Sequence, residues 1–325
     1  MLLPSLPAEL KAALDAKLQG LSRNETATRA ALISKTYRDG GSSGTIQSAT
    51  DALAYALARM PATYAAITAS LNALCEVRPD FVPETLLDVG AGPGTASWAA
   101  AEAFSSLKSF ALLDDNAALR ALALDFARGN ARLGDSKYQK GQASDLLARS
   151  ERADLVIASY MIGELGEVER TKFADLVWSK TRDTLLIVEP GTPAGTARVL
   201  ALRQQLIAAG AHVAAPCPHD GPCPLSSPDW CHFAQRLPRS RAHMQLKGAD
   251  VPFEDEKFAY VALTRAPGTV HPARVLAQPL AGKAEISAKL CTTDGLVIAR
   301  IPHRDKTAYA RARRWRWGDT VQDES

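Results

Sequence analysis

The chain has 325 residues, of which 46% are hydrophobic and 22% charged, as in ordinary soluble globular proteins. The net charge of only +3 gives no sign of nucleic-acid binding in the bulk composition, and no apolar run reaches the length that a membrane span needs. This length allows one large domain or two ordinary ones, with a core that needs no disulfides.

The N-terminal residues Met1–Leu10 contain no basic stretch followed by an apolar run, so we expect no secretory signal. They are also not rich in arginine, and no organellar transit peptide is evident. The sequence therefore predicts a reducing, cytosolic location, where disulfides are rare and clustered cysteines are more often metal ligands or catalytic groups.

Residues 1–80 form the first predicted region, and we expect it to be helical. Leu10, Leu14 and Leu18 repeat at a spacing of four residues, which is typical of a helix. A second helical stretch covers residues 52–69, and Pro61 is expected to break it.

Short apolar strands alternate with helical segments through residues 81–204. The predicted strands are Thr85–Val89, Ser109–Asp114, Asp154–Ser159 and Thr184–Glu189, and the predicted helices are Ala96–Phe104 and Ala117–Arg128. This alternation predicts βαβ units and a parallel sheet, in a Rossmann-like α/β core. The carboxyl ends of the strands then share one edge, where ligands bind.

Residues 205–257 interrupt this rhythm with proline, cysteine and polar residues, so we expect an insertion organised by the cysteines. Residues 258–325 begin with Phe258–Leu263, which reads as the last strand of the core. The segments 274–280, 284–290 and 295–301 then predict a small antiparallel β element, followed by a basic tail.

A glycine-rich turn follows the first predicted strand, in the string Asp88-Val-Gly90-Ala-Gly92-Pro-Gly94. Glycines permit a tight turn and a close approach of the backbone to a ligand. Nicotinamide enzymes share such turns, but the GxGxG spacing and the acid directly before it favour S-adenosylmethionine. The alternative is a turn with no ligand.

Polar residues at the other strand ends complete the predicted donor site. Asp114 or Asp115 ends the next strand and suits a bond to ribose hydroxyls, although one of the two could be a surface acid. Asp145 stands where an acid commonly meets the adenine amino group, or it caps a helix. Ser159 ends the third strand and joins the predicted donor-binding residues.

Four of the five cysteines form a set with the spacing C-x5-C-x7-C-x59-C, namely Cys217, Cys223, Cys231 and Cys291. Zinc sites usually place two ligands two to four residues apart, and no such pair exists here. Four thiolates are the ligand set of a [4Fe–4S] cluster, so we favour iron–sulfur and keep zinc as the alternative. Unrelated buried cysteines are a third interpretation, which we apply only to Cys75.

A catalytic cysteine is a competing hypothesis, because Pro-Cys pairs hold the nucleophile in cytosine C5 methylation. That nucleophile should follow the strand ending near Ser159, or the next strand directly. The segment after Ser159 is Tyr160-Met-Ile-Gly-Glu164, without cysteine. This segment also lacks the Asn/Asp-Pro-Pro-Tyr pattern that positions an exocyclic amine. The sequence therefore names no catalytic residue.

Several motifs together resemble a known family. They are Tyr55-x3-Arg59-Met-Pro61-x-Thr63-Tyr64, the glycine string from Asp88, Glu189-Pro-Gly191, Cys217-x5-Cys223-Pro-Leu, Asp229-Trp-Cys-His-Phe233, Glu254-Asp-Glu-Lys-Phe258 and Trp317-Gly-Asp319. They are similar to the methyltransferase-like proteins of the mitochondrial ribosomal small subunit and their bacterial relatives, over residues 50–319.

This resemblance implies a class I methyltransferase fold with an S-adenosylmethionine pocket and a four-cysteine iron–sulfur site at Cys217, Cys223, Cys231 and Cys291. It also implies a role in assembly of the small ribosomal subunit and contact with its RNA. Methyl transfer to that RNA and a non-catalytic assembly role both stay open. Because no transit peptide is evident, we expect a bacterial cytosolic member.

Basic segments support RNA as the partner and argue against a small-molecule methyltransferase. The tail Tyr309–Trp317 interleaves arginine with aromatic residues, which could engage phosphates and stack on bases. The alternative is that the tryptophans pack on the domain while the arginines face water. Arg236, Arg239, Arg241 and Lys247 follow the cysteines and predict a second basic face.

Overall fold

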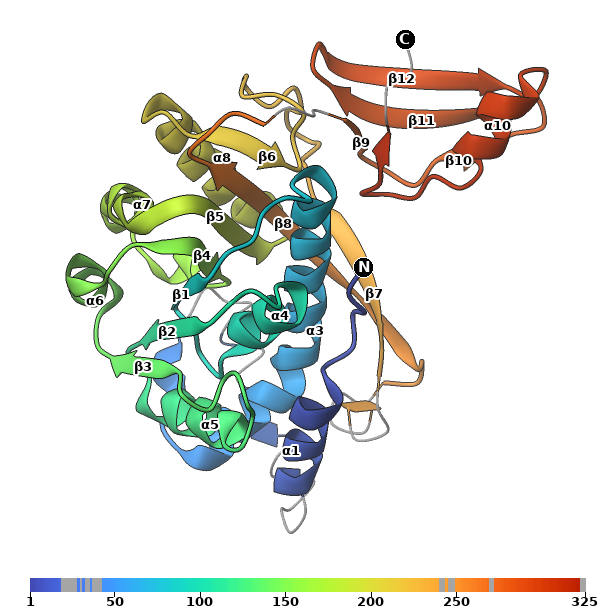
Figure 1. Cartoon of the computed structure of the whole chain (residues 1–325). Helices are drawn as coiled ribbons and strands as arrows, with labels where there is room; N and C mark the ends of the chain where they lie inside the picture. The colour runs from blue at the N-terminus through green and yellow to red at the C-terminus, as the bar shows by residue number, and fades with distance from the viewer. Residues whose placement is uncertain are drawn as a thin grey trace.

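The structure is a computed structural model that describes residues 1–18, 28–29, 31–32, 36, 43–239, 243–244, 249–268 and 272–321. Figure 1 shows a large α/β core and, at one end of it, a small sheet built by the C-terminal residues. Within the described residues no helix is long and apolar enough to cross a membrane.

The core is a sheet with the strand order β3-β2-β1-β4-β5-β8-β6, in which β7 pairs with the extended part of β8. Its strands are β1 (Thr85–Val89), β2 (Ser109–Asp114), β3 (Lys137–Lys140), β4 (Ala153–Ser159), β5 (Thr181–Pro190), β6 (His212–Ala215), β7 (Phe233–Pro238) and β8 (Phe253–Thr264). The first five run parallel, and β8 is antiparallel to its neighbours. This is the class I methyltransferase arrangement, so the predicted fold class is confirmed.

Helices cover both faces of this sheet. One face is covered by α1 (Ala8–Leu18), α3 (Ala49–Val77), α4 (Thr95–Ala103) and α5 (Ala117–Ala127), and the other by α6 (Ala143–Arg149), α7 (Glu167–Lys180) and α8 (Pro193–Ala208). Successive strand residues supply opposite faces, as Leu86 joins the first layer and Leu87 the second. The strands are therefore buried on both sides, as expected of parallel strands between helices.

Helix α3 differs from the prediction, because it runs through Pro61 without ending. It begins at a capping box in which Ser48 and Asp51 satisfy each other's backbone N–H groups. A proline inside a helix costs about 3 kcal/mol. Burial of an almost continuous row of side chains, including Met60 and Tyr64, outweighs that cost.

The expected insertion at residues 205–257 is smaller than predicted. Its flanks contain the end of α8, all of β6 and β7, and the first residues of β8, which pair within the core sheet. Within the described residues, the cysteine loop between β6 and β7 spans residues 216–232 and contains no helix or strand.

The C-terminal sheet confirms the predicted antiparallel element. It contains β9 (Ala273–Val275), β10 (Leu280–Ala281), β11 (Glu285–Thr292), β12 (Gly295–Pro302) and β13 (Thr320–Val321), with helix α10 (Lys306–Ala312) between β12 and β13. Its small core consists of Val275, Ala288 and Leu290, against which Trp315 and Val321 pack.

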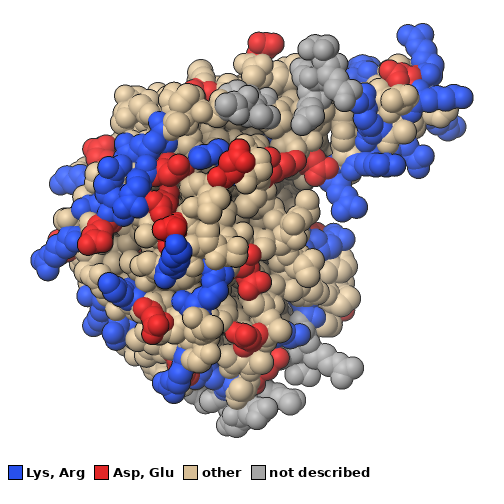
Figure 2. Space-filling view, in the orientation of Figure 1, with Lys and Arg blue, Asp and Glu red and all other residues tan. Residues whose placement is uncertain are grey.

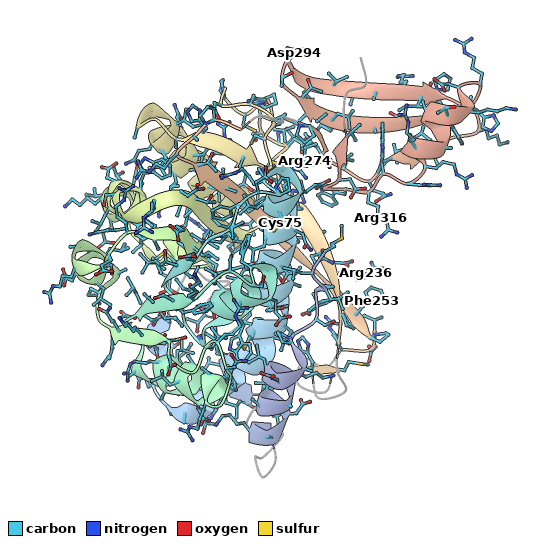
Figure 3. The ribbon with its side chains drawn as sticks, viewed as in Figure 1. Cys75, Arg236, Phe253, Arg274, Asp294 and Arg316 are labelled. Atoms are coloured by element: carbon cyan, nitrogen blue, oxygen red, sulfur yellow. The ribbon has the colours of Figure 1, made fainter. Side chains whose placement is uncertain are left out.

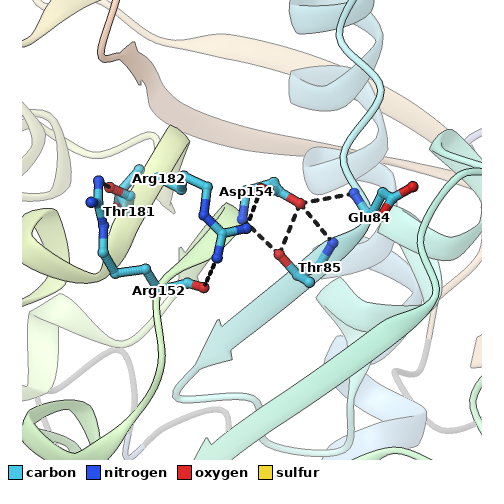
Figure 4. A network of polar contacts seen from close by, with 6 residues as sticks. All are labelled: Glu84, Thr85, Arg152, Asp154, Thr181 and Arg182. Carbon is cyan, nitrogen blue, oxygen red and sulfur yellow. Dashed lines mark hydrogen bonds and ion pairs between the residues drawn. The ribbon is translucent and has the colours of Figure 1, made fainter.

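A polar network fastens the amino ends of β1, β4 and β5 (Figure 4). The carboxylate of Asp154 accepts hydrogen bonds from the backbone of Glu84 and Thr85 and pairs with Arg182 at 2.6 Å. Burial acts to raise the pKa of Asp154, but these hydrogen bonds hold it below its usual value. This edge of the sheet is thus fixed, and the opposite, carboxyl edge is left for ligands.

Candidate donor and metal sites

The glycine turn leaves β1 in a conformation that only glycine adopts easily. Gly90, Gly92 and Gly94 have φ angles of +69°, +53° and +82°. A Cβ atom at Gly90 would also lie 2.7 Å from the Cβ of Met161. The predicted need for glycine at these positions therefore has a geometric basis in the structure.

A cavity of about 300 Å³ opens beside this turn, at the carboxyl edge of the sheet. Its lining includes Ser43, Tyr55, Gly90, Gly92, Asp114, Asp115, Gln142, Ser159, Tyr160, Met161, Glu164 and Glu169.

Three predicted donor residues do not line this cavity. Gly94 is the N-cap residue of α4, and Asp88 is fully buried at the end of β1. Asp145 is exposed in the first turn of α6. The structure thus brings together Gly90, Gly92, Asp114, Asp115 and Ser159 but leaves Asp145 outside the group.

Asp88 is held by α4 on one oxygen only. Its Oδ2 accepts hydrogen bonds from the backbone N–H and the hydroxyl of Ser97, at 3.0 and 2.8 Å. Its buried Oδ1 has no hydrogen-bond partner among the described residues. Burial raises the pKa of Asp88 to about 7 despite these bonds, and the charge of Asp114 acts in the same direction.

The cavity itself is acidic. Asp114 accepts hydrogen bonds at 2.8 Å from the backbone N–H groups of Gly92 and Asn116, yet burial and the charge of Asp115 raise its pKa. Burial also raises the pKa of Glu164, with contributions from both aspartates, although Ser43 donates hydrogen bonds to it. Acids that are crowded in this way favour a cationic ligand with hydroxyl groups.

S-adenosylmethionine fits this description, because it carries a sulfonium, an ammonium and two ribose hydroxyls. Asp114 and Asp115 face the cavity with oxygens that can accept from hydroxyls, and the glycine turn exposes backbone with no side chain in the way. The residues present therefore suit this donor.

Tyr160 directly follows β4 and has the strained φ angle of +56° for a non-glycine residue. Its hydroxyl donates to Glu256 Oε1 at 2.9 Å, and Arg59 Nη2 lies 3.1 Å from the same oxygen. Burial and the charge of Glu256 raise the pKa of Tyr160 well above its usual value. The phenol is therefore a neutral hydrogen-bond donor and no base.

Sequence reasoning did not assign Ser43, Tyr55, Tyr160 or Glu164 to the cavity. Tyr55 belongs to the motif Tyr55-x3-Arg59-Met-Pro61, and Tyr160 follows the predicted strand end at Ser159, so the sequence did indicate both positions. Ser43 and Glu164 meet across 121 positions in the chain, and no local pattern indicates that contact.

The four cysteines of the set line one small cavity between the cysteine loop and β11. The other lining residues are Pro216, Pro224, Leu225, Phe233, Arg274 and Leu276. All five cysteines of the chain are free thiols, and Cys75 lies apart on α3, against the larger core. The structure thus brings the predicted ligand set together and leaves out the fifth cysteine.

Two buried arginines face these thiols. Burial raises the pKa values of Cys217, Cys231 and Cys291, that of Cys291 to about 12, while the charges of Arg203 and Arg274 act to lower those of Cys217 and Cys291. Arg203 and Arg274 are only 3% and 2% exposed. Buried positive charge beside four thiols suits a negatively charged metal–thiolate group.

No metal is shown by this geometry alone. Among the described residues, no three His, Cys, Asp or Glu side chains are arranged to hold a single metal ion. His219 is a near neighbour, with Nε2 3.7 Å from the Sγ of Cys291.

The cysteine loop is fastened to the core near the donor site. Trp230 Nε1 donates to the carbonyl of Gly191 at 3.0 Å, and the hydroxyl of Thr196 donates to the carbonyl of Cys231 at 2.9 Å. Nearby, Glu189 is the second-last residue of β5, is almost fully buried and pairs with Arg198 at 3.0 Å. Burial nevertheless raises the pKa of Glu189 to about 7.

Residues 49–322 match a protein family described as "Mitochondrial small ribosomal subunit Rsm22". This chain belongs to the Rsm22 family. The ribosome assembly protein METTL17, mitochondrial, of Homo sapiens is 29% identical over 296 residues, which are 83% of this chain and 62% of that protein. The Rsm22-cox11 tandem protein 2, mitochondrial, of Schizosaccharomyces pombe is 25% identical over 319 residues, 82% of this chain and 42% of that protein. The chain thus spans less than two thirds of these relatives.

Solved structures of methyltransferases are similar to the core. A protein described as a putative RNA methyltransferase from Pyrococcus horikoshii is 13% identical, with 62% of this chain and 84% of that chain covered at a TM-score of 0.41. Magnesium protoporphyrin IX methyltransferase from Synechocystis PCC 6803 is 9% identical, with coverage of 80% and 98% and a TM-score of 0.43.

The prediction of a bacterial cytosolic protein is contradicted by these relatives. The Rsm22 family and its matching members carry mitochondrial descriptions. The prediction depended on the low arginine content of the first residues, and that composition proved a poor guide to location.

The predicted basic face of this Rsm22-family chain is largely neutralised. Arg236 pairs with Asp255 at 2.8 Å while stacking over Phe253, and Arg239 pairs with Glu254 at 3.0 Å. Arg241 and Lys247 lie outside the described residues.

The basic tail is divided between packing and exposure. Trp315 packs into the C-terminal sheet, and Trp317 lies edge-on to His232 at 4.7 Å. Arg313, Arg314 and Arg316 are exposed. Residues 272–321 hold ten Lys or Arg against four Asp or Glu, and Figure 2 shows their blue side chains concentrated on the C-terminal sheet. Both tryptophans therefore pack on the domain, as the alternative interpretation expected, and the positive charge is exposed beside them.

Proposed function

We propose that this chain is a mitochondrial assembly protein of the small ribosomal subunit that binds S-adenosylmethionine and acts on the RNA of that subunit. The observation that carries the proposal is the acid-lined cavity at the glycine turn, in a chain of the Rsm22 family. METTL17, a relative, is named as a ribosome assembly protein. Because the chain spans only part of such relatives, its activity needs its own test.

The donor would be held by residues with distinct tasks. Asp114 and Asp115 would accept hydrogen bonds from its hydroxyls, Gly90 and Gly92 would allow the backbone to approach, and Ser159 also lines the cavity. Asp88 would support the turn from below, and Asp145 is the weakest member because it is exposed. When bound, S-adenosylmethionine supplies an electrophilic methyl group, and alignment of the acceptor then carries much of the rate gain.

A non-catalytic assembly role is the second candidate, and one observation favours it. The polar groups beside the cavity are already engaged, since Tyr160 donates to Glu256 and Glu189 pairs with Arg198. Neither is placed as a general base. An acceptor that needs deprotonation would have to bring its own base.

The cysteine set would hold a [4Fe–4S] cluster, with zinc as the alternative. Support comes from four thiols on one cavity, from two buried arginines that would balance an anionic cluster, and from the absence of the close ligand pairs typical of zinc. Its role would be structural. The thiol of Cys291 comes from β11 and the others from the cysteine loop, so the cluster would join the C-terminal sheet to the core.

The C-terminal sheet would contact the ribosomal RNA. Its exposed arginines and lysines can engage phosphates without base specificity. Arg316 extends from this sheet towards the β7–β8 ribbon, which carries Arg236 and Phe253 (Figure 3). Binding through such contacts should weaken steeply as salt is raised.

Two measurements test the donor and the reaction. Calorimetry with S-adenosylmethionine should show binding at a single site, and absence of binding by the wild-type chain contradicts the proposal. Mass mapping of small-subunit RNA from cells with and without the gene then separates the candidates. A lost methyl mark indicates catalysis, whereas unchanged marks with immature subunits indicate the assembly role.

The metal is tested by anaerobic purification. We expect iron with a visible absorption band from thiolate-bound iron and sulfide. Stoichiometric zinc without iron would replace the cluster by the alternative.

A further inference from the structure

Strand β12 forms one border of the C-terminal sheet and has an open edge. Within the described residues it pairs only with β11, and Figure 1 shows it as the outermost strand of that sheet. Natural edge strands are normally short, charged, bulged or covered, because an open edge pairs with other chains. This edge is eight residues long and regular in register.

Its side chains are unusually apolar for such a position. Leu296, Val297 and Ile298 are consecutive and are 41%, 42% and 53% exposed. Because neighbouring strand residues point to opposite faces, both faces of the edge expose apolar surface. Water contact with these residues is unfavourable unless another strand covers them.

The hydrogen-bond pattern shows which backbone groups are open. The hairpin turn makes Thr292 and Gly295 a hydrogen-bonded pair, so Val297 and Ala299 also point their backbone groups at β11. The carbonyl of Lys289 confirms this alternation, since it accepts from Leu276 on the far side. In β12, Leu296, Ile298 and Arg300 therefore direct their N–H and C=O groups outward.

The charges at the two ends of this edge have opposite signs. Asp294 is exposed at the hairpin tip, as Figure 3 shows, and Arg300 is exposed six residues further on. Arg300 lies 3.2 Å from Glu285 on β11, but its side chain is 70% exposed and can serve a second carboxylate. A second copy of β12 that pairs antiparallel would place its Arg300 opposite Asp294 and its Asp294 opposite Arg300.

We propose that two copies of this chain associate through their β12 edges, which pair antiparallel around a two-fold axis at Val297. In this register Leu296 of one copy lies opposite Ile298 of the other, and the outward backbone groups of both face each other. Asp294 of each copy then lies opposite Arg300 of its mate. The sheet becomes continuous across the dimer, and its contacts are self-complementary as a two-fold interface requires.

A single strand pair is smaller than the standard interface of about 1,200–2,000 Å². We therefore expect a reversible dimer whose population rises across the micromolar range. The inference goes beyond the proposed function, because the dimer needs neither S-adenosylmethionine nor RNA to form.

Sedimentation velocity and light scattering of the purified holoprotein, over micromolar to millimolar concentrations, test the dimer. Asp294→Arg or Arg300→Asp alone places like charges opposite each other and should raise the dissociation constant at least about tenfold. The double variant Asp294→Arg/Arg300→Asp restores opposite charges and should return to within about threefold of the wild type.

A second pair of variants separates the edge from general surface effects. Ile298→Pro removes an outward N–H that the monomer does not use, so the fold should persist by circular dichroism while the dimer is lost. Val168→Lys changes a residue that is 68% exposed on α7 and should leave association unchanged. The inference is overturned if the wild type stays a monomer at all concentrations. It is also overturned if neither Asp294→Arg nor Arg300→Asp changes the dissociation constant of the dimer.

Discussion

The donor cavity and the cysteine cavity carry opposite charge. The first collects Asp114, Asp115 and Glu164, and burial raises the pKa values of Asp114 and Glu164. The second places two buried arginines beside thiols whose pKa values are also raised by burial. An acidic cavity favours a cation, and a basic cavity favours an anion.

Each cavity is therefore electrostatically incomplete without its proposed ligand. Donor and cluster would each supply the missing opposite charge, so ligand loss should affect stability as well as function. The two cavities differ in construction too. The donor cavity lies at strand ends of one sheet, whereas the cysteine cavity needs segments that are about sixty residues apart.

The largest expected effect is removal of one thiol. Cys231→Ser should reduce metal content to near background, because the proposed cluster needs four thiolates. Hydrogen exchange should then show loss of protection in β9 and β11 while donor affinity stays within about twofold. Cys75→Ser is the matched control and should keep its metal. Equal loss of protection around the glycine turn would show that the two cavities are not separate.

Removal of a buried positive charge should come next. Arg274 donates to the carbonyls of Pro216 and Gly318 at 3.2 and 2.8 Å, besides facing the thiols. We expect Arg274→Met to lower the unfolding free energy by about 3–5 kcal/mol, since it leaves buried partners unpaired. Denaturant unfolding measures this, and the exposed Arg316→Met should change stability by less than about 0.5 kcal/mol. A small effect at Arg274 would mean that the thiols need no balancing charge.

Asp88, which is buried next to the glycine turn, should produce a pH dependence of stability. Asp88 has a pKa of about 7 in the folded chain instead of 3.8. As the pH rises, the carboxyl of Asp88 loses its proton at a lower pH in the unfolded chain than in the folded chain. The free energy of unfolding therefore falls between pH 3.8 and about pH 7, by up to about 4 kcal/mol. Asp88→Asn cannot titrate and should gain on the wild type over this window in urea unfolding. A constant difference between the two proteins across this pH range would refute the raised pKa.

The smallest effect is expected for donor binding. Asp114→Asn removes one charged acceptor and should weaken S-adenosylmethionine about 10- to 100-fold in calorimetry. Asp145→Asn is the control, because that residue is exposed and outside the cavity, and it should bind within about twofold of the wild type. The reverse ranking would return the adenine role to Asp145.

Local patterns predicted the core, and contacts between distant segments limited the rest. The strands Thr85–Val89 and Ser109–Asp114 begin and end where the apolar runs do, because both faces of a parallel strand are buried. Pro61 was expected to end a helix, but packing of α3 outweighs a local preference. The meeting of Ser43 and Glu164 has no local signal at all.

The sequence predicted the cysteines of the second site but not the arginines beside them. The spacing of the cysteines and their proline neighbours identified the four that line one cavity, because a segment rich in cysteine and proline is recognisable from the sequence without knowledge of the fold. The two arginines that face them were not predicted. Arg203 lies on α8 and Arg274 on β9, among many arginines with the same local appearance.

Cys291 and Arg274 also give the cysteine site a place in the order of synthesis. The loop with Cys217, Cys223 and Cys231 leaves the ribosome well before the strands β9 and β11 that supply the fourth thiol and the second buried arginine. Until those strands are made, the loop supplies only three of the four thiols that the proposed cluster would need. Incorporation of the proposed cluster would therefore report that translation has passed β11, the strand that carries the fourth thiol.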